Sequence, residues 1–175
     1  MSDRGPRSVS HSKVTLTQMM EVTDANVAGN VHGGVIMRLV DTAAALAAIK
    51  HSGGVALTVG IDEMTFLEPV QIGEVVVLRA SVNDIGRTSI ECGVRVEAED
   101  PLTGMIRHVN SAYLVFVAVD EKGRPRPVPP LIAESEDERR RQREAKLRRE
   151  RRIDHKDAID AARSAKRARP EPAEH

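Results

Sequence analysis

Hydrophobic and polar positions alternate along much of the chain up to residue 131, with one stretch of helical period between them. The segment from Val14 to Met19 alternates in this way and predicts a short strand. From Val35 to His51 the apolar residues recur three and four positions apart, which predicts a helix. Because the apolar stripe of that helix is wide and rich in alanine, we expect it to be buried around much of its circumference.

Four more strands are predicted after the helix. Alternating or β-branched residues place them at 55–61, 74–82, 89–98 and 106–119. Residues that favour turns separate the strands, for example Asn83-Asp84-Ile85-Gly86 and Asp100-Pro101. Such short joints imply that successive strands are antiparallel neighbours. The predicted fold class is therefore α+β, with an antiparallel sheet of about five strands wrapped around one long central helix.

The C-terminal part of the chain has a different composition. The 42 residues from Glu134 to His175 contain 14 Lys and Arg and 11 Asp and Glu, which leaves 12 basic and 15 acidic residues before them. Its only large aliphatic residues stand six positions apart, which fits neither a helical stripe nor a heptad seam. We therefore expect a disordered N-terminus over 1–10, a domain over 11–131, and a charged tail, helical or disordered, over 132–175.

Composition also argues against several classes of protein. The single cysteine, Cys92, cannot form an internal disulfide framework or a cysteine-rich zinc site. No run approaches the roughly 18 apolar residues of a membrane span, and residues 1–13 lack the apolar region of a secretory signal. A formal net charge of zero and only three aromatic residues argue against nucleic-acid binding. We expect a cytoplasmic protein with no metal, no nucleic-acid partner and no membrane insertion.

The candidate chemistry is concentrated between Asn26 and Asp41. Gly33 and Gly34 stand at the start of the predicted helix, where free N–H groups attract negative charge and glycine permits close approach, as in an oxyanion hole. Asp41 lies about two turns inside the same helix and is the only carboxylate between Val27 and Asp62. Taken singly, each residue also has an ordinary explanation, as a turn residue or as an exposed carboxylate.

Taken together, these residues resemble a known family. The block from Asp24 to Gly34, with Asp41 seven positions later, is similar to the acyl-CoA thioesterases of the hotdog fold, the type found in bacterial acyl-CoA hydrolases and in the cytosolic long-chain acyl-CoA hydrolases of animals. The resemblance continues at 64–70, 72–76, 86–89 and 116–125, and it covers about residues 12–131. The charged tail lies outside it.

The resemblance implies hydrolysis of an acyl-CoA thioester to CoA and a fatty acid, with no cofactor. It also implies a homodimer with a continuous sheet, a trimer of such dimers, and active sites at the dimer interface. In the family the functional asparagine, here Asn26, and the functional acid, here Asp41, come from opposite subunits. Asp41 would activate a water or act as the nucleophile, and these two roles stay open. Gly34, with Gly33, would hold the developing oxyanion.

The resemblance implies further contacts with the substrate. His32, beside the two glycines, would shape the pocket. The turn that contains Arg87, Thr88 and Ser89 would run along the pantetheine arm of CoA. Arg87 or Arg107 could meet the CoA phosphates, although a solvated arginine is the commoner situation.

Two other functions remain as alternatives. A hotdog dehydratase or hydratase would use a histidine base near the start of the central helix, and His32 keeps this possibility open because residues 35–50 contain no histidine. A non-catalytic acyl-CoA-binding regulator would be expected to lack Asn26 or Asp41, and both are present.

Overall fold

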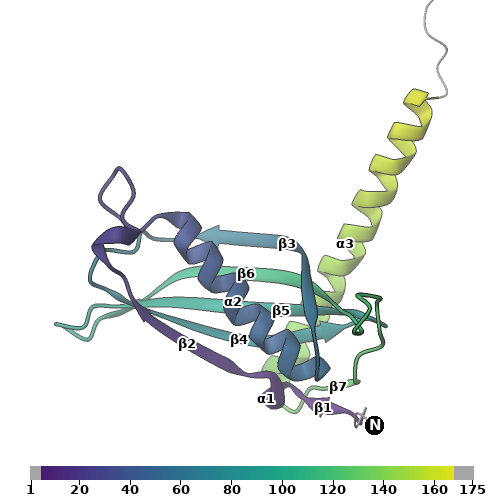
Figure 1. Ribbon diagram of the computed structural model, residues 1–175, viewed down its shortest axis with the longest axis horizontal. Helices are drawn as coiled ribbons and strands as arrows, with labels where there is room; N and C mark the ends of the chain where they lie inside the picture. The colour runs from purple at the N-terminus through teal and green to yellow at the C-terminus, as the bar shows by residue number, and fades with distance from the viewer. Residues whose placement is uncertain (1–4, 168–175) are drawn as a thin grey trace, which may run out of the picture.

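The computed structural model describes residues 5–167, and its body is a five-stranded antiparallel sheet (Figure 1). The strands are β2 (Val14–Met19), β3 (Ala56–Phe66), β4 (Val75–Ile85), β5 (Ser89–Glu99) and β6 (Ile106–Ala118). They lie in the order β2-β4-β5-β6-β3, so β2 and β3 are the two edges of the sheet. The predicted α+β layout, with about five antiparallel strands and one long central helix, is confirmed.

The central helix, α2 (Gly33–Ser52), lies along one face of the sheet (Figure 1). It contacts all five strands and, together with them, forms the hydrophobic core. The helix begins two residues earlier than predicted, because the ring Nδ1 of His32 accepts a hydrogen bond from the Gly34 N–H and caps the first turn. It ends at Gly53, whose φ of 67° is a left-handed conformation that glycine adopts readily. The buried residues of α2 are Ile36, Leu39, Val40, Ala43, Ala44, Ala47, Ala48, His51 and Ser52.

Short elements tie the N-terminal segment to the body. Strand β1 (Arg7–Ser8) pairs in parallel with β7 (Leu131–Ile132), and a single helical turn, α1 (Val9–Ser12), follows it. The buried Ser12 hydroxyl accepts a hydrogen bond from the Val82 N–H of β4 at 3.0 Å. Residues 7–10 thus belong to β1 and α1, within the segment 1–10 for which the sequence predicts disorder; residues 1–4 lie outside the described part. A short 3₁₀ turn, η1 (Val22–Asp24), follows β2.

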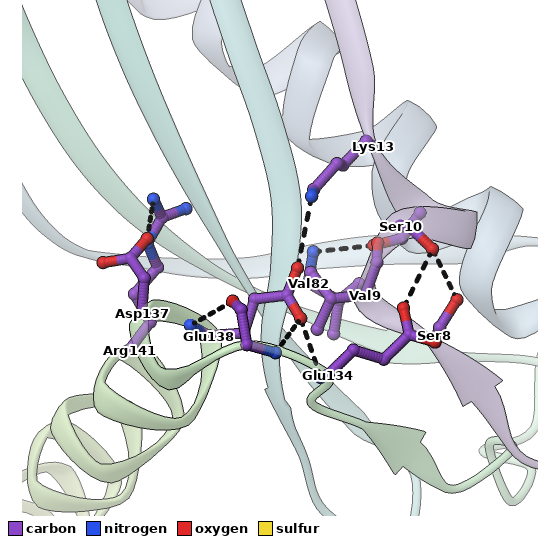
Figure 2. A network of polar contacts seen from close by, with 11 residues as sticks. Ser8, Val9, Ser10, Lys13, Val82, Glu134, Asp137, Glu138 and Arg141 are labelled. Atoms are coloured by element: carbon purple, nitrogen blue, oxygen red, sulfur yellow. Dashed lines mark hydrogen bonds and ion pairs between the residues drawn. The ribbon is translucent and has the colours of Figure 1, made fainter.

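The charged tail forms a long helix, α3 (Glu136–Arg167), which crosses the face of the sheet opposite α2 (Figure 1). Figure 2 shows how its first turn is fixed to the N-terminal segment. The Glu138 carboxylate accepts bonds from the N–H groups of Glu134 and Ser135 and pairs with Lys13 at 3.2 Å, while the Glu138 N–H donates to the Ser135 hydroxyl. This reciprocal arrangement is a capping box, and it sets the direction in which α3 leaves.

A buried ion pair then holds α3 on the sheet. Because successive strand residues point to opposite faces, Glu91 points away from α2 while its neighbour Cys92 lies in the core. Arg148 donates to the Glu91 carboxylate at 2.6 Å, and its guanidinium lies 3.6 Å from the centroid of the Tyr113 ring. Burial raises the pKa of Glu91, an effect that the bond from Arg148 opposes. The first half of α3 is thus docked, which differs from the solvated segment expected from its composition.

Replacing Arg148 with methionine should destabilise the chain by about 3 kcal/mol, because the buried Glu91 carboxylate loses its hydrogen-bonded cation and keeps only Arg152, at 3.8 Å. The double variant Arg148→Met with Glu91→Gln should recover most of that loss. Urea unfolding monitored by circular dichroism measures both changes. The matched control is Arg143→Met, which breaks an exposed pair with Glu136 and should cost less than about 0.5 kcal/mol. Equal effects of the two single variants would contradict a docked α3.

Within residues 5–167, no helix is long and apolar enough to cross a membrane.

Candidate functional site

Asn26 is fixed in a tight loop by its own side chain. Its Oδ1 accepts hydrogen bonds from the N–H groups of Ala28 at 2.8 Å and Asn30 at 3.2 Å, and its Nδ2 lies 3.5 Å from the carbonyl oxygen of Val31. Gly29 closes the loop with a φ of 84°. The Asn26 oxygen therefore holds the loop, whereas the amide nitrogen has a second N–H with which to bind a ligand.

An open cleft of about 320 Å³ lies beside this loop, between the start of α2 and the end of β3. Asn26, Gly33 and Phe66 line it, and the half-exposed Phe66 ring supplies much of its apolar wall. The remaining lining residues are Asn30, Val31, Ile36, Leu67, Glu68, Pro69 and Val70. Two of the predicted site residues, Asn26 and Gly33, thus share one cleft.

The backbone amide of Gly34 already has a partner. Its N–H donates to Nδ1 of His32 at 2.9 Å, so His32 acts as the cap of α2. For Gly33, by contrast, no acceptor for the N–H is found among residues 5–167. A carbonyl oxygen would reach the Gly34 amide only after the His32 ring turned away, whereas the Gly33 amide is accessible as it stands.

Asp41 is half-buried and faces β3 from the middle of α2. Its Oδ1 accepts a hydrogen bond from the Thr58 hydroxyl at 2.8 Å. Thr58 pairs in register with the core residue Phe116, which places both side chains on the face toward α2. The strand register then shifts between Thr58 and Gly60, so Thr58 lies at a β-bulge. The hydroxyl fixes one carboxylate oxygen and leaves the other for chemistry.

Thr58 was not predicted as a site residue. The sequence pattern pointed the other way, because the apolar residues Leu57, Val59 and Ile61 alternate with Thr58 and so assign Thr58 to the outward side of the strand. Its importance depends on the register that places it beside Asp41, and a single sequence does not specify that register.

Asp41 and Asn26 are not brought together within one chain. Asp41 is absent from the described residues that line the Asn26 cleft; it lies farther along α2, opposite Thr58 near the start of the edge strand β3. The apolar side chains Leu57, Val59 and Ile61 of β3 are each more than 40% exposed, and the outer edge of this strand is unpaired. An exposed apolar edge of this kind is typical of a surface that pairs with another strand.

The turn that contains Arg87, Thr88 and Ser89 lies between β4 and β5, away from the Asn26 cleft. The carbonyl oxygens of Arg87 and Thr88 accept bonds from Val128 and Ala118, so the turn is anchored to the exit of β6. The Arg87 side chain is exposed, and Ser89 borders a small recess together with Arg149 of α3.

The structure also defines the surroundings of Arg107, His108 and Cys92. Arg107 pairs with Glu74 and Glu68, each at 2.6 Å, and these carboxylates raise its pKa. Nε2 of His108 lies 2.9 Å from the Ser111 hydroxyl, and Cys92 is fully buried. In the described part of the chain, no group of three His, Cys, Asp or Glu side chains is arranged to hold a metal ion.

Residues 28–105 match the Thioesterase superfamily. Protein VdlD of Helicobacter pylori is 34% identical over 139 residues, which is 79% of each chain. The human cytosolic acyl coenzyme A thioester hydrolase is 31% identical over 145 residues, which is 82% of this chain and 38% of that protein.

Solved structures of acyl-CoA thioesterases also superpose on this chain. An apo-hexameric acyl-CoA thioesterase superposes with a TM-score of 0.84 at 34% identity, covering 86% of this chain and 97% of the other. Acyl-CoA hydrolase from Staphylococcus aureus, in complex with butyryl coenzyme A, coenzyme A and coenzyme A disulfide, superposes with a TM-score of 0.82 at 29% identity, covering 91% and 96%. Structures of that S. aureus enzyme with an aspartate, an asparagine or a threonine replaced by alanine are similar as well.

Proposed function

Because the chain belongs to the hotdog-fold family of acyl-CoA thioester hydrolases, we infer that it hydrolyses acyl-CoA to CoA and a fatty acid at sites built by two copies of the chain. The position of Asp41 is the observation that most directly supports a site shared between two copies. Thr58 holds its carboxylate at the edge strand β3, outside the cleft that Asn26 lines. One chain thus contributes Asn26 to one site and Asp41 to a second site, and a second copy would complete both.

The comparison with the S. aureus enzyme supports a part in the reaction for Asn26, Asp41 and Thr58. The asparagine, aspartate and threonine that were replaced there stand in the same order and spacing as Asn26, Asp41 and Thr58 in this chain. Each of the three was replaced by alanine in a solved structure of that enzyme. We propose that these three residues form part of the active site in this chain.

The edge of β3 supports the proposed dimer. Antiparallel pairing of β3 with the β3 of a second copy would satisfy the open strand edge and bury its apolar row. It would also carry Asp41 of one copy toward the cleft of the other. We further propose a trimer of dimers, since similar thioesterases are hexameric, and a cytoplasmic location, as for the cytosolic human relative.

The chemistry follows from these positions. Asp41 takes a proton from a water whose oxygen attacks the thioester carbonyl; the carbon–sulfur bond breaks, and the CoA thiolate recovers the proton. Alternatively, Asp41 attacks the carbonyl carbon directly and the carbon–sulfur bond breaks to release the CoA thiolate; water then cleaves the resulting anhydride to the fatty acid and the Asp41 carboxylate, and the proton released goes to the thiolate. In both routes the Gly33 N–H stabilises the oxyanion, with Gly34 joining when His32 moves, and Nδ2 of Asn26 orients the water or the thioester. An oxyanion donor typically contributes ~10²–10³ in rate.

Purified protein should release free thiol from acyl-CoA substrates. An assay over chain lengths from acetyl to palmitoyl, with a thiol-reactive chromophore, tests this function and gives the chain-length preference. Binding of acyl-CoA without thiol release would instead favour a regulator, and hydration of an enoyl-CoA would favour the dehydratase class. Neither result is expected with both Asn26 and Asp41 present.

Replacing Thr58 with valine should lower kcat about tenfold, because the Asp41 carboxylate loses the hydrogen bond that orients it. The KM for acyl-CoA should change little, since Thr58 acts through Asp41. The Thr58→Ser variant keeps the hydroxyl and should recover most of kcat. If serine and valine lowered kcat equally, the hydrogen bond to Asp41 would not be the reason.

A further inference from the structure

Helix α3 starts beside Lys13, at the beginning of β2, and then contacts four strands of the sheet in turn. Its docked contacts follow the strand order from the start of β2 to the β3 edge: Glu138 with Lys13, Gln142 with Asp84, Arg148 with Glu91 and Tyr113, and Arg152 with Asp62. The last contact, between Arg152 and Asp62, lies on the edge strand itself. The direction of α3 is therefore set by Lys13, just before β2, and then by four strands in succession.

Beyond Arg152 the helix continues past the edge of the sheet. Figure 1 shows this part, in yellow, projecting beyond β3. We call Ile153–Arg167 the distal segment. Every residue from Ile153 to Ser164 is exposed. At 1.5 Å per residue the distal segment is about 22 Å long, which matches the width of about four strands spaced ~4.8 Å apart.

We propose that the distal segment lies on the partner subunit and binds the face of the partner's sheet next to its β3. This inference rests on the β3-to-β3 dimer of the proposed function, because only there does a second sheet begin where the first one ends. A helix that runs across four strands of one sheet would then continue over the strands of the next.

Charge supports this docking. Residues of α3 that face the sheet recur three and four positions apart, and the same stripe continues in the distal segment through Lys156, Ile159 and Arg163. On the sheet, Glu63 pairs in register with Tyr113, which Arg148 covers, so Glu63 lies on the α3 side. Glu63 is exposed, and no cation pairs with it among residues 5–167. The partner's Glu63 thus offers a carboxylate to Lys156, one turn beyond Arg152.

Cross-linking of mixed dimers tests the inference. One chain carries Lys156→Cys and the other, with a different affinity tag, carries Glu63→Cys; a short bismaleimide is added after mixing. The native Cys92 is fully buried and stays unreactive. We expect most mixed dimers to be joined covalently. The matched control pairs Lys156→Cys with Leu102→Cys, a 94% exposed position at the β5–β6 turn, and should not cross-link.

Deletion of residues 153–175 provides the second measurement. It should raise the dissociation constant of the dimer at least tenfold, while thiol release at high protein concentration stays unchanged. If the dimer is stable but shows no cross-link, and its dissociation constant does not change on deletion, the inference is wrong. The proposed function is not affected by that result. A chain that is monomeric by light scattering overturns both the inference and the shared active site.

Discussion

Replacing Asp41 with asparagine should lower kcat for acyl-CoA hydrolysis by ~10²–10⁴-fold, the usual contribution of a general base. The asparagine oxygen still accepts the hydrogen bond from Thr58, so the local geometry is kept. What is lost is the ability to take a proton or to form an anhydride. Thiol release measures kcat, and the urea midpoint checks the fold. A matched control, Glu121→Gln in the exposed turn after β6, should leave kcat unchanged.

Two further measurements make the Asp41 result specific. In single turnovers in heavy-oxygen water, label in the Asp41 carboxylate would identify Asp41 as a nucleophile whose anhydride is cleaved at the aspartyl carbonyl, whereas a general base places the label in the fatty acid alone. His32→Ala should retain kcat within about tenfold, because His32 caps α2 through Gly34 rather than reacting. Full kcat in Asp41→Asn, or its loss in His32→Ala, would instead point to histidine-based chemistry.

Mixed dimers of Asn26→Ala and Asp41→Asn should regain about one quarter of the wild-type kcat, although each variant alone is nearly inactive. In a random mixture half of the dimers are mixed, and each of these has one intact site out of two, because the symmetry axis relates the two sites. The recovered activity is read by thiol release after the two inactive proteins are refolded together.

The matched control combines both substitutions in one chain and mixes it with wild-type protein. Such mixed dimers contain no intact site, so the mixture should retain only the activity of its wild-type homodimers. Mixed dimers verified by mass spectrometry that show no rescue would mean that Asn26 and Asp41 act within one chain. The positions of the two residues, one in a cleft and one outside it, argue against that outcome.

The strands and the central helix were predictable because their burial repeats at a fixed period. Alternation in β5 correctly assigned Cys92 and its even-numbered neighbours to the core, and the helical stripe of α2 matched its buried face. The first turn of α2 was missed because its glycines have low helical propensity. The cap supplied by His32 offsets that cost, and histidine is not a common capping residue.

Candidate site residues could be proposed from the sequence only where they stand close together in it. The block from Asn26 to Asp41 contains most of them, whereas Thr58 comes from another element and becomes relevant through strand register. The docking of α3 was also missed. Its charges predict a solvated helix, but Arg148 and Arg152 meet carboxylates on β5 and β3, and those partners are set by tertiary structure alone.

The path of α3 restricts how dimers can assemble further. Two sheets that stack face to face approach to about 10 Å, and a helix with its side chains is itself about 10–12 Å thick. Since α2 covers one face of the sheet and the docked part of α3 occupies the other, neither face can receive a second sheet without displacing a helix. Back-to-back tetramers are therefore excluded while α3 stays docked. In the proposed trimer of dimers, the contacts between dimers would therefore not be a direct stack of two sheets.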